Sequence, residues 1–111
     1  MTDIQVEGAQ VKIGQETHEF DENIDDHAVI NDIVAVILSV PNDEVNNRNI
    51  IGFGTDGSRQ WRVESLYSGD DDIPYVYIDT KDGKLIADTW TGVRVTIEPN
   101  TGEIIDTKFM K

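Results

Sequence analysis

Short segments in which apolar and polar residues alternate follow one another along most of the chain. Residues 93–98 (VRVTIE) alternate strictly, and residues 59–64 (RQWRVE) place Trp61 and Val63 on one face. Such alternation is typical of a strand that buries one of its faces. Residues 33–38 (IVAVIL) are apolar throughout, which predicts a central strand covered on both faces. The segments predicted to be strands are 3–7, 10–14, 17–20, 24–30, 33–40, 49–54, 59–64, 75–80, 84–90, 93–98 and 103–109.

Turn signals separate these segments. Glycine and small polar residues tolerate the positive φ angles of tight hairpins, so pairs of them mark the ends of strands. Residues 41–48 leave room for one helical turn after Pro41, and residues 65–74 are predicted to form the longest exposed loop. The clearest turn signals are Asp56-Gly57, Asp82-Gly83, Thr91-Gly92 and Thr101-Gly102.

The pattern as a whole predicts an all-β protein in which about nine to eleven short strands form an antiparallel meander. Because no linker interrupts the chain, residues 1–111 are expected to form a single domain. The meander is expected to fold either into a two-sheet sandwich or barrel, or into two propeller-like blades. Open strand edges are a liability in a protein of this size, which favours a homodimer that covers them.

Residues 75–105 contain a hairpin at residues 82–85 (DGKL), a turn at residues 90–92 (WTG), an alternating strand and a second turn at residues 101–103 (TGE). This order of strands and turns resembles one repeat of the quinoprotein-type (PQQ-like) β-propeller family. Residues 49–61 have the same layout of strand, glycine turn and strand. The resemblance implies blade-like local structure. It does not imply a closed ring, because a propeller needs about four or more blades and this chain holds about two.

The propeller repeat normally carries a docking tryptophan a few residues after its last glycine. Trp61 follows Gly57 in this way, whereas Asp106 stands near the corresponding place after Gly102. The resemblance carries over no quinone site, and no cofactor is expected.

The charge of the chain limits its partners. Its 22 acidic and 9 basic residues give a net charge of −13, so binding to nucleic acid or attraction to an anionic membrane is not expected. Three explanations of the acidity are open: solubility or adaptation to a high-salt cytoplasm, attraction to a protein with a basic surface, and cation binding. The first is the simplest. The chain has no cysteine, and its first ten residues do not resemble a signal peptide, so a cytoplasmic protein is expected.

Two motifs suggest ligand chemistry but lack the residues that should accompany them. Residues 52–57 (GFGTDG) match the glycine pattern of a nucleotide-binding loop, yet a strand rather than a helix is predicted to follow. A tight turn is the better interpretation. Asp70-Asp71-Asp72 suggests a cation site, but the residues that follow Asp79 do not have the ligand spacing of an EF-hand. These aspartates, and the acidic residues between positions 21 and 26, are interpreted as solvated, and no metal site is predicted.

His18 and His27 are the only histidines, and both lie in an acidic stretch. A histidine beside carboxylates can act as a general base or bind a metal. No third ligand of clear identity accompanies them, and the chain has no G-x-S-x-G nucleophile motif. Both are interpreted as surface or edge-strand residues, and no catalytic residue is predicted.

Tyr75, Tyr77 and Trp90 are the candidate binding surface, because the two tyrosines alternate with apolar residues and Trp90 ends a predicted strand. The sequence therefore predicts a binding protein without catalytic activity. The first hypothesis is an inhibitor or immunity-type protein that recognises a basic protein partner, in general resemblance to bacterial immunity proteins. The alternatives are a module that binds carbohydrate or a small ligand through the aromatic surface, and an enzyme whose site is not visible as a motif.

Overall fold

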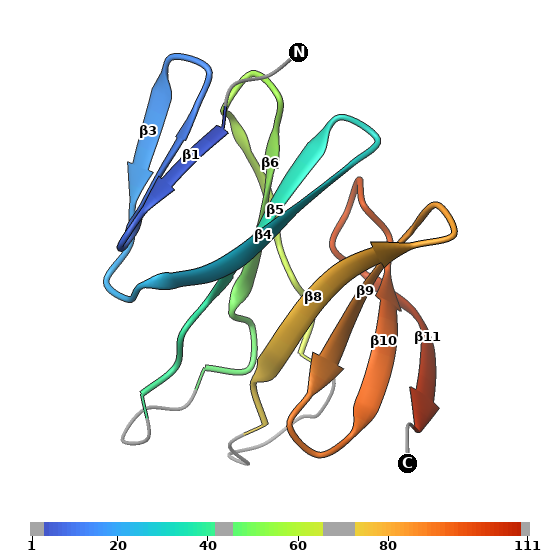
Figure 1. The fold of residues 1–111 in the computed structure, drawn as a ribbon. Helices are drawn as coiled ribbons and strands as arrows, with labels where there is room; N and C mark the ends of the chain where they lie inside the picture. Colours follow the sequence, from blue (N-terminus) through green and yellow to red (C-terminus); the bar gives the residue numbers. More distant parts are fainter. Residues whose placement is uncertain (1–3, 42–45, 66–72, 110–111) are drawn as a thin grey trace.

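The computed structural model describes residues 4–41, 46–65 and 73–109, and every regular element within these ranges is a β-strand. The eleven strands are antiparallel and form three sheets that follow one another along the chain (Figure 1). Each strand pairs with its neighbours in sequence, so each sheet is a simple meander. The described ranges contain no long apolar helix that could cross a membrane. The first sheet consists of β1 (Ile4–Glu7), β2 (Gln10–Ile13) and β3 (Glu16–Glu19); the middle sheet of β4 (Ile24–Ile30), β5 (Ile33–Leu38), β6 (Ile50–Gly54) and β7 (Arg59–Arg62); and the last sheet of β8 (Tyr75–Lys81), β9 (Lys84–Thr89), β10 (Val93–Ile97) and β11 (Ile104–Phe109).

The predicted all-β meander is confirmed. Each predicted strand segment coincides with an observed strand to within two residues at either end. The blade-like arrangement extends further than the sequence indicated, because a three-stranded sheet precedes the two four-stranded ones. The helical turn expected near residues 41–48 and the loop expected at residues 65–74 fall largely outside the described residues.

The middle sheet is covered on both faces, as predicted for residues 33–38. All six residues of β5 are buried. Val34 packs with Val11 in the core between the first and middle sheets. Its neighbour Ala35 packs with Leu85 in the core between the middle and last sheets. Because successive side chains of a strand point to opposite faces, a continuous apolar run supplies both cores at once.

Trp61 joins the middle sheet to the last one. Its side chain lies in the core between the two sheets, and its Nε1 donates a hydrogen bond of 2.6 Å to the carbonyl oxygen of Pro99. Pro99 belongs to the turn between β10 and β11. Within its own sheet the indole lies against Gly52, where an added Cβ would be 2.2 Å from the ring. Only glycine leaves room for the ring at that position.

Asn49 is a second joint between the same two sheets. Its side chain is fully buried just before β6. Its Nδ2 donates to the carbonyl oxygens of Leu38 at 2.9 Å and Tyr75 at 2.8 Å, and its Oδ1 accepts a hydrogen bond of 3.0 Å from the Tyr75 amide. A buried amide with all these partners connects the start of β8 to the end of β5 and the start of β6.

Candidate functional surfaces

Negative charge is concentrated at one end of the chain. Residues 1–47 contain eleven acidic side chains and one basic one, Lys12, whereas residues 48–111 contain eleven acidic and eight basic side chains. The first region forms the first sheet, β4 and β5, which lie side by side in Figure 1. The exposed carboxylates of this region, here called the acidic surface, are Glu7, Glu16, Glu19, Asp21, Asp25, Asp26 and Asp32.

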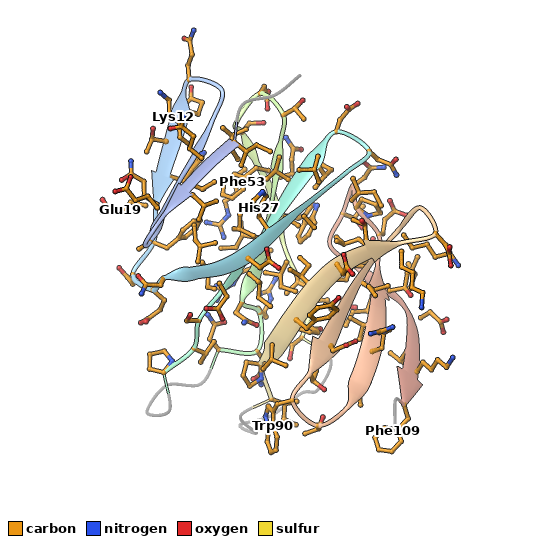
Figure 2. The ribbon with its side chains drawn as sticks, in the orientation of Figure 1. Lys12, Glu19, His27, Phe53, Trp90 and Phe109 are labelled. Atoms are coloured by element: carbon orange, nitrogen blue, oxygen red, sulfur yellow. The ribbon has the colours of Figure 1, made fainter. Side chains whose placement is uncertain are left out.

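Within residues 1–47 the acidic surface has only Lys12 to offset its charge, and Arg59 and Arg62 of the middle sheet line a hollow beside Asp21. Figure 2 labels Lys12 and Glu19, which both lie on the first sheet. The salt bridge recorded among the described residues joins Arg94 to Asp88 in the last sheet, at 2.7 Å. Two carboxylates of the acidic surface accept hydrogen bonds from neutral donors: Asp25 from the Ser39 hydroxyl and Asp26 from the His27 amide. A strand framework that places unneutralised carboxylates together creates a negative potential that attracts positively charged groups.

Two of the three residues predicted to form an aromatic surface are exposed. Tyr77 and Trp90 are exposed, at 42% and 62% of their surface, but Tyr75 is 2% exposed and packs in the core. The prediction was wrong for Tyr75 because a bulge lies between Tyr75 and Tyr77. The bulge breaks the alternation, so that Val76 and Tyr77 are both exposed while Tyr75 and Ile78 are both buried.

Burial and hydrogen bonding raise the pKa values of the two tyrosines. The Tyr75 hydroxyl donates to the carbonyl oxygen of Glu64 at 2.9 Å, and burial raises the pKa of Tyr75 well above its ordinary value. The Tyr77 hydroxyl donates to the carboxylate of Asp79 at 2.7 Å. This hydrogen bond raises the pKa of Tyr77 and, together with the Thr80 amide, lowers the pKa of Asp79.

A second exposed aromatic side chain lies at the same end of the last sheet as Trp90. Phe109, at the end of β11, is 64% exposed and pairs with Val93 at the start of β10. Trp90 lies in the turn that leads into β10, and Figure 2 shows both rings at this end of the molecule. The sequence does not single out Phe109, because it lies in the last strand and no motif marks it.

The two histidines do not come together as a metal or catalytic pair. His18 Nε2 lies 2.6 Å from the carbonyl oxygen of Gly57, and its ring contacts Phe53 with ring centres 4.5 Å apart. A carbonyl oxygen can only accept, so Nε2 is the donor. His27 is exposed on β4. His18 therefore joins the first sheet to the middle one, a role that the sequence analysis did not predict.

The glycine motif at residues 52–57 forms a tight turn, in agreement with its preferred interpretation. Gly54 donates to the carbonyl oxygen of Ser58, Gly57 donates to that of Gly54, and Gly57 has a φ of 87°. In the described ranges, no group of three or more possible metal ligands lies close together. Asp70, Asp71 and Asp72 lie outside those ranges.

A cleft of about 450 Å³ lies beside the junction of the middle and last sheets. Two of its lining residues, Arg48 and Arg62, carry positive charge in an otherwise acidic protein. Nothing in the sequence marked the site, because the arginines stand on either side of the β6–β7 hairpin and only the fold brings them together. The lining residues of this arginine cleft are Arg48, Arg62, Glu64, Ser65, Thr101, Gly102 and Glu103.

Comparisons with known proteins agree with the fold and assign no activity. The family described as "Domain of unknown function (DUF7957)" matches residues 1–109. A comparison with curated proteins finds no match. Among solved structures, the crystal structure of BamB from Moraxella catarrhalis, a PQQ-like β-propeller protein, is similar with a TM-score of 0.56 and 14% sequence identity. The similarity covers 83% of this chain and 26% of that chain, so this chain spans about a quarter of it. At this identity the likeness shows a propeller-like fold and no more.

Proposed function

This chain belongs to the family described as a domain of unknown function, DUF7957, and we propose that it is a non-catalytic binding protein that recognises a protein partner with a basic surface. The proposal rests on the acidic surface. Its carboxylates are gathered on one part of the fold, and the chain supplies Lys12 as the only basic residue in that region.

The carboxylates of the acidic surface repel one another and attract positively charged groups. Like charges held near one another on a folded surface repel, and this repulsion opposes folding slightly. A partner that brings lysine or arginine side chains to the surface relieves the repulsion and is attracted from a distance. Such a surface mainly raises the rate of association and disfavours acidic competitors. An inhibitor or immunity-type protein that acts by covering a basic site would use it in this way.

The fold supports this role by holding the surface rigid. The first sheet packs on the middle sheet through Val11 and Ile13, which are fully buried. His18 fixes the same two sheets together from β3. Carboxylates on β1, β3 and β4 are therefore presented without a large ordering cost on binding.

The test compares two variants that remove the same charge from different places. Glu19→Gln with Asp26→Asn neutralises two carboxylates of the acidic surface. Asp82→Asn with Asp106→Asn neutralises two carboxylates of the last sheet. The immobilised proteins are exposed to lysate of the source organism at low salt, and retained proteins are identified by mass spectrometry and then titrated.

We expect a basic protein to be retained by the wild type and by the last-sheet variant. The acidic-surface variant should bind the purified partner about 3- to 30-fold more weakly, with a smaller dependence on salt. Equal binding by both variants, or retention of no basic protein, would overturn the proposal.

A second candidate function is supported by the exposed rings of Tyr77, Trp90 and Phe109. Flat aromatic side chains at the end of a sheet suit the apolar face of a sugar ring or of a small ligand. A glycan array would test it, with Trp90→Ala expected to abolish any binding and His27→Ala, also exposed, expected to retain it. Unchanged binding by Trp90→Ala would exclude this surface.

A further inference from the structure

We propose that the arginine cleft is a binding site for a small oxyanion, namely a carboxylate or phosphate group held by Arg48 and Arg62. The proposal does not depend on the function proposed for the acidic surface, although Arg62 also lines a second hollow together with Asp21 of that surface.

The two arginines are held in position by the backbone. Arg48 Nε donates to the carbonyl oxygen of Val63 at 2.9 Å, and Arg62 Nε donates to the carbonyl oxygen of Arg48 at 2.7 Å. A terminal nitrogen of Arg62 also donates to Oδ1 of Asn46 at 2.8 Å. These bonds fix the guanidinium planes and use only part of their donor capacity. Fixed planar donors lose little side-chain entropy when an oxyanion binds.

Two neighbouring arginines act on the charge of Arg62. Its pKa is lowered first by partial burial and then by the charges of Arg48 and Arg59. The salt bridge recorded among the described residues, Arg94–Asp88, lies in the last sheet. An oxyanion between the guanidinium groups would offset their mutual repulsion and form charge-assisted hydrogen bonds.

Two acidic side chains in the cleft limit what can bind. Glu64 and Glu103 also line the cleft, and Glu64 Oε1 accepts a hydrogen bond of 3.2 Å from the Ile104 amide. These two carboxylates repel an extended polyanion such as nucleic acid. A single carboxylate or phosphate group is small enough to contact Arg48 and Arg62 within the cleft volume of about 450 Å³. The Thr101 side chain also lines the cleft and offers a hydroxyl group to such a ligand.

The test is a titration of the full chain with inorganic phosphate and, separately, with acetate, at constant ionic strength maintained with chloride. The Nε–H resonances of Arg48 and Arg62 are followed by NMR. We expect saturable shifts of both resonances with at least one of the two anions. Tighter binding of phosphate or of acetate identifies which kind of group the cleft prefers. Shifts that never saturate, or that chloride reproduces, would overturn the proposal.

Three variants separate binding from folding. Arg48→Gln is expected to weaken binding about tenfold or more, because bidentate donation to the oxyanion is lost. Lys84→Gln removes the same charge from β9 of the last sheet, outside the cleft, and should leave binding nearly unchanged. Glu103→Gln removes a repelling carboxylate and should tighten binding about two- to fivefold. An Arg48→Gln protein that folds and binds as tightly as the wild type would exclude the site. Weaker binding by Glu103→Gln would contradict the repelling role assigned to Glu103.

Discussion

The indole ring of Trp61 lies directly against Gly102 of the next sheet. A Cβ added to Gly102 would be 2.6 Å from ring atom Cε3, and Gly102 has a φ of 78°, which side chains rarely adopt. The same ring donates from Nε1 to Pro99, three residues earlier in the same turn. The middle and last sheets therefore meet where a large ring occupies space that a glycine leaves open.

Replacing Gly102 by alanine should weaken this joint beyond the ordinary cost of positive φ. Gly83 provides the control, because its φ is 76° and nothing lies within 4 Å of an added Cβ. We expect Gly83→Ala to cost about 1–2 kcal/mol in free energy of unfolding. Gly102→Ala should cost about 1–3 kcal/mol more, because the indole must move. Urea denaturation measures both values. Equal losses in free energy of unfolding would show that the contact with Trp61 does not contribute to stability.

His18 repeats the arrangement of Trp61 one sheet earlier. Each residue stands four positions after a glycine of positive φ, Gly14 for His18 and Gly57 for Trp61. Each ring donates to a backbone carbonyl in the last turn of the following sheet. The chain thus uses the same joint twice, with a smaller ring between the first two sheets.

Removal of the His18 ring should destabilise the first sheet. We expect His18→Thr to cost about 1–3 kcal/mol, because the buried carbonyl of Gly57 loses its side-chain donor and Phe53 loses a ring contact. His27→Thr, which changes an exposed histidine in a strand, should alter stability by about 0.5 kcal/mol or less. Thermal unfolding at neutral pH distinguishes the two. A loss for His27→Thr as large as that for His18→Thr would contradict the docking role.

Local sequence determined the strands but not the way the sheets meet. The apolar run at Ile33–Leu38 predicted a doubly covered strand, because alternation and burial are encoded residue by residue. The burial of Tyr75 was missed because a bulge shifts the alternation by one position. The joints at His18 and Asn49 were also missed. Their partners lie 39 and 26 residues away, and such contacts depend on how whole sheets pack.

The acidic and aromatic surfaces could be predicted in part from the sequence, whereas the arginine cleft could not. Trp90 was predicted at a strand end and is exposed, and the acidity of the first region can be read directly from composition. The arginine cleft was not predictable, because Arg48 and Arg62 approach one another only after β6 and β7 pair. A charge that appears isolated in the sequence acquires its neighbours from the pairing of strands.

Asn49 should be among the most sensitive positions of the protein. In Asn49→Ala, the carbonyl oxygens of Leu38 and Tyr75 and the amide of Tyr75 all lose a buried partner. We expect a loss of about 3 kcal/mol or more in free energy of unfolding, since each unsatisfied buried group costs about 1–3 kcal/mol. Asn100→Ala, at an exposed turn, is the control and should cost about 0.5 kcal/mol or less. A mild effect at Asn49 would mean that water replaces the lost amide.

The hydrogen bond between Tyr77 and Asp79 leads to a prediction about pH. The Tyr77 hydroxyl is the main cause of the lowered pKa of Asp79, so Tyr77→Phe should raise that pKa toward its ordinary value of 3.8. Asp56 is an internal control, because its pKa is lowered by the amide and hydroxyl of Ser58, in another sheet. NMR titration of the carboxyl carbons should therefore show a shift at Asp79 and none at Asp56. Equal pKa values of Asp79 in both proteins would exclude the hydrogen bond in solution.

The hydrogen bond between Tyr77 and Asp79 also determines how the free energy of unfolding changes with pH. Because the pKa of Asp79 is lower in the folded than in the unfolded state, the ionised carboxylate stabilises the fold above the unfolded-state pKa. This contribution is lost as the pH falls through the folded-state pKa. Wild type should therefore be more stable than Tyr77→Phe at pH 6, and the two should converge in acid below the pKa of Asp79. Denaturation at pH 6 and at about pH 2 measures both differences, and a gap that stays constant between them would assign the effect of Tyr77 to packing rather than to Asp79.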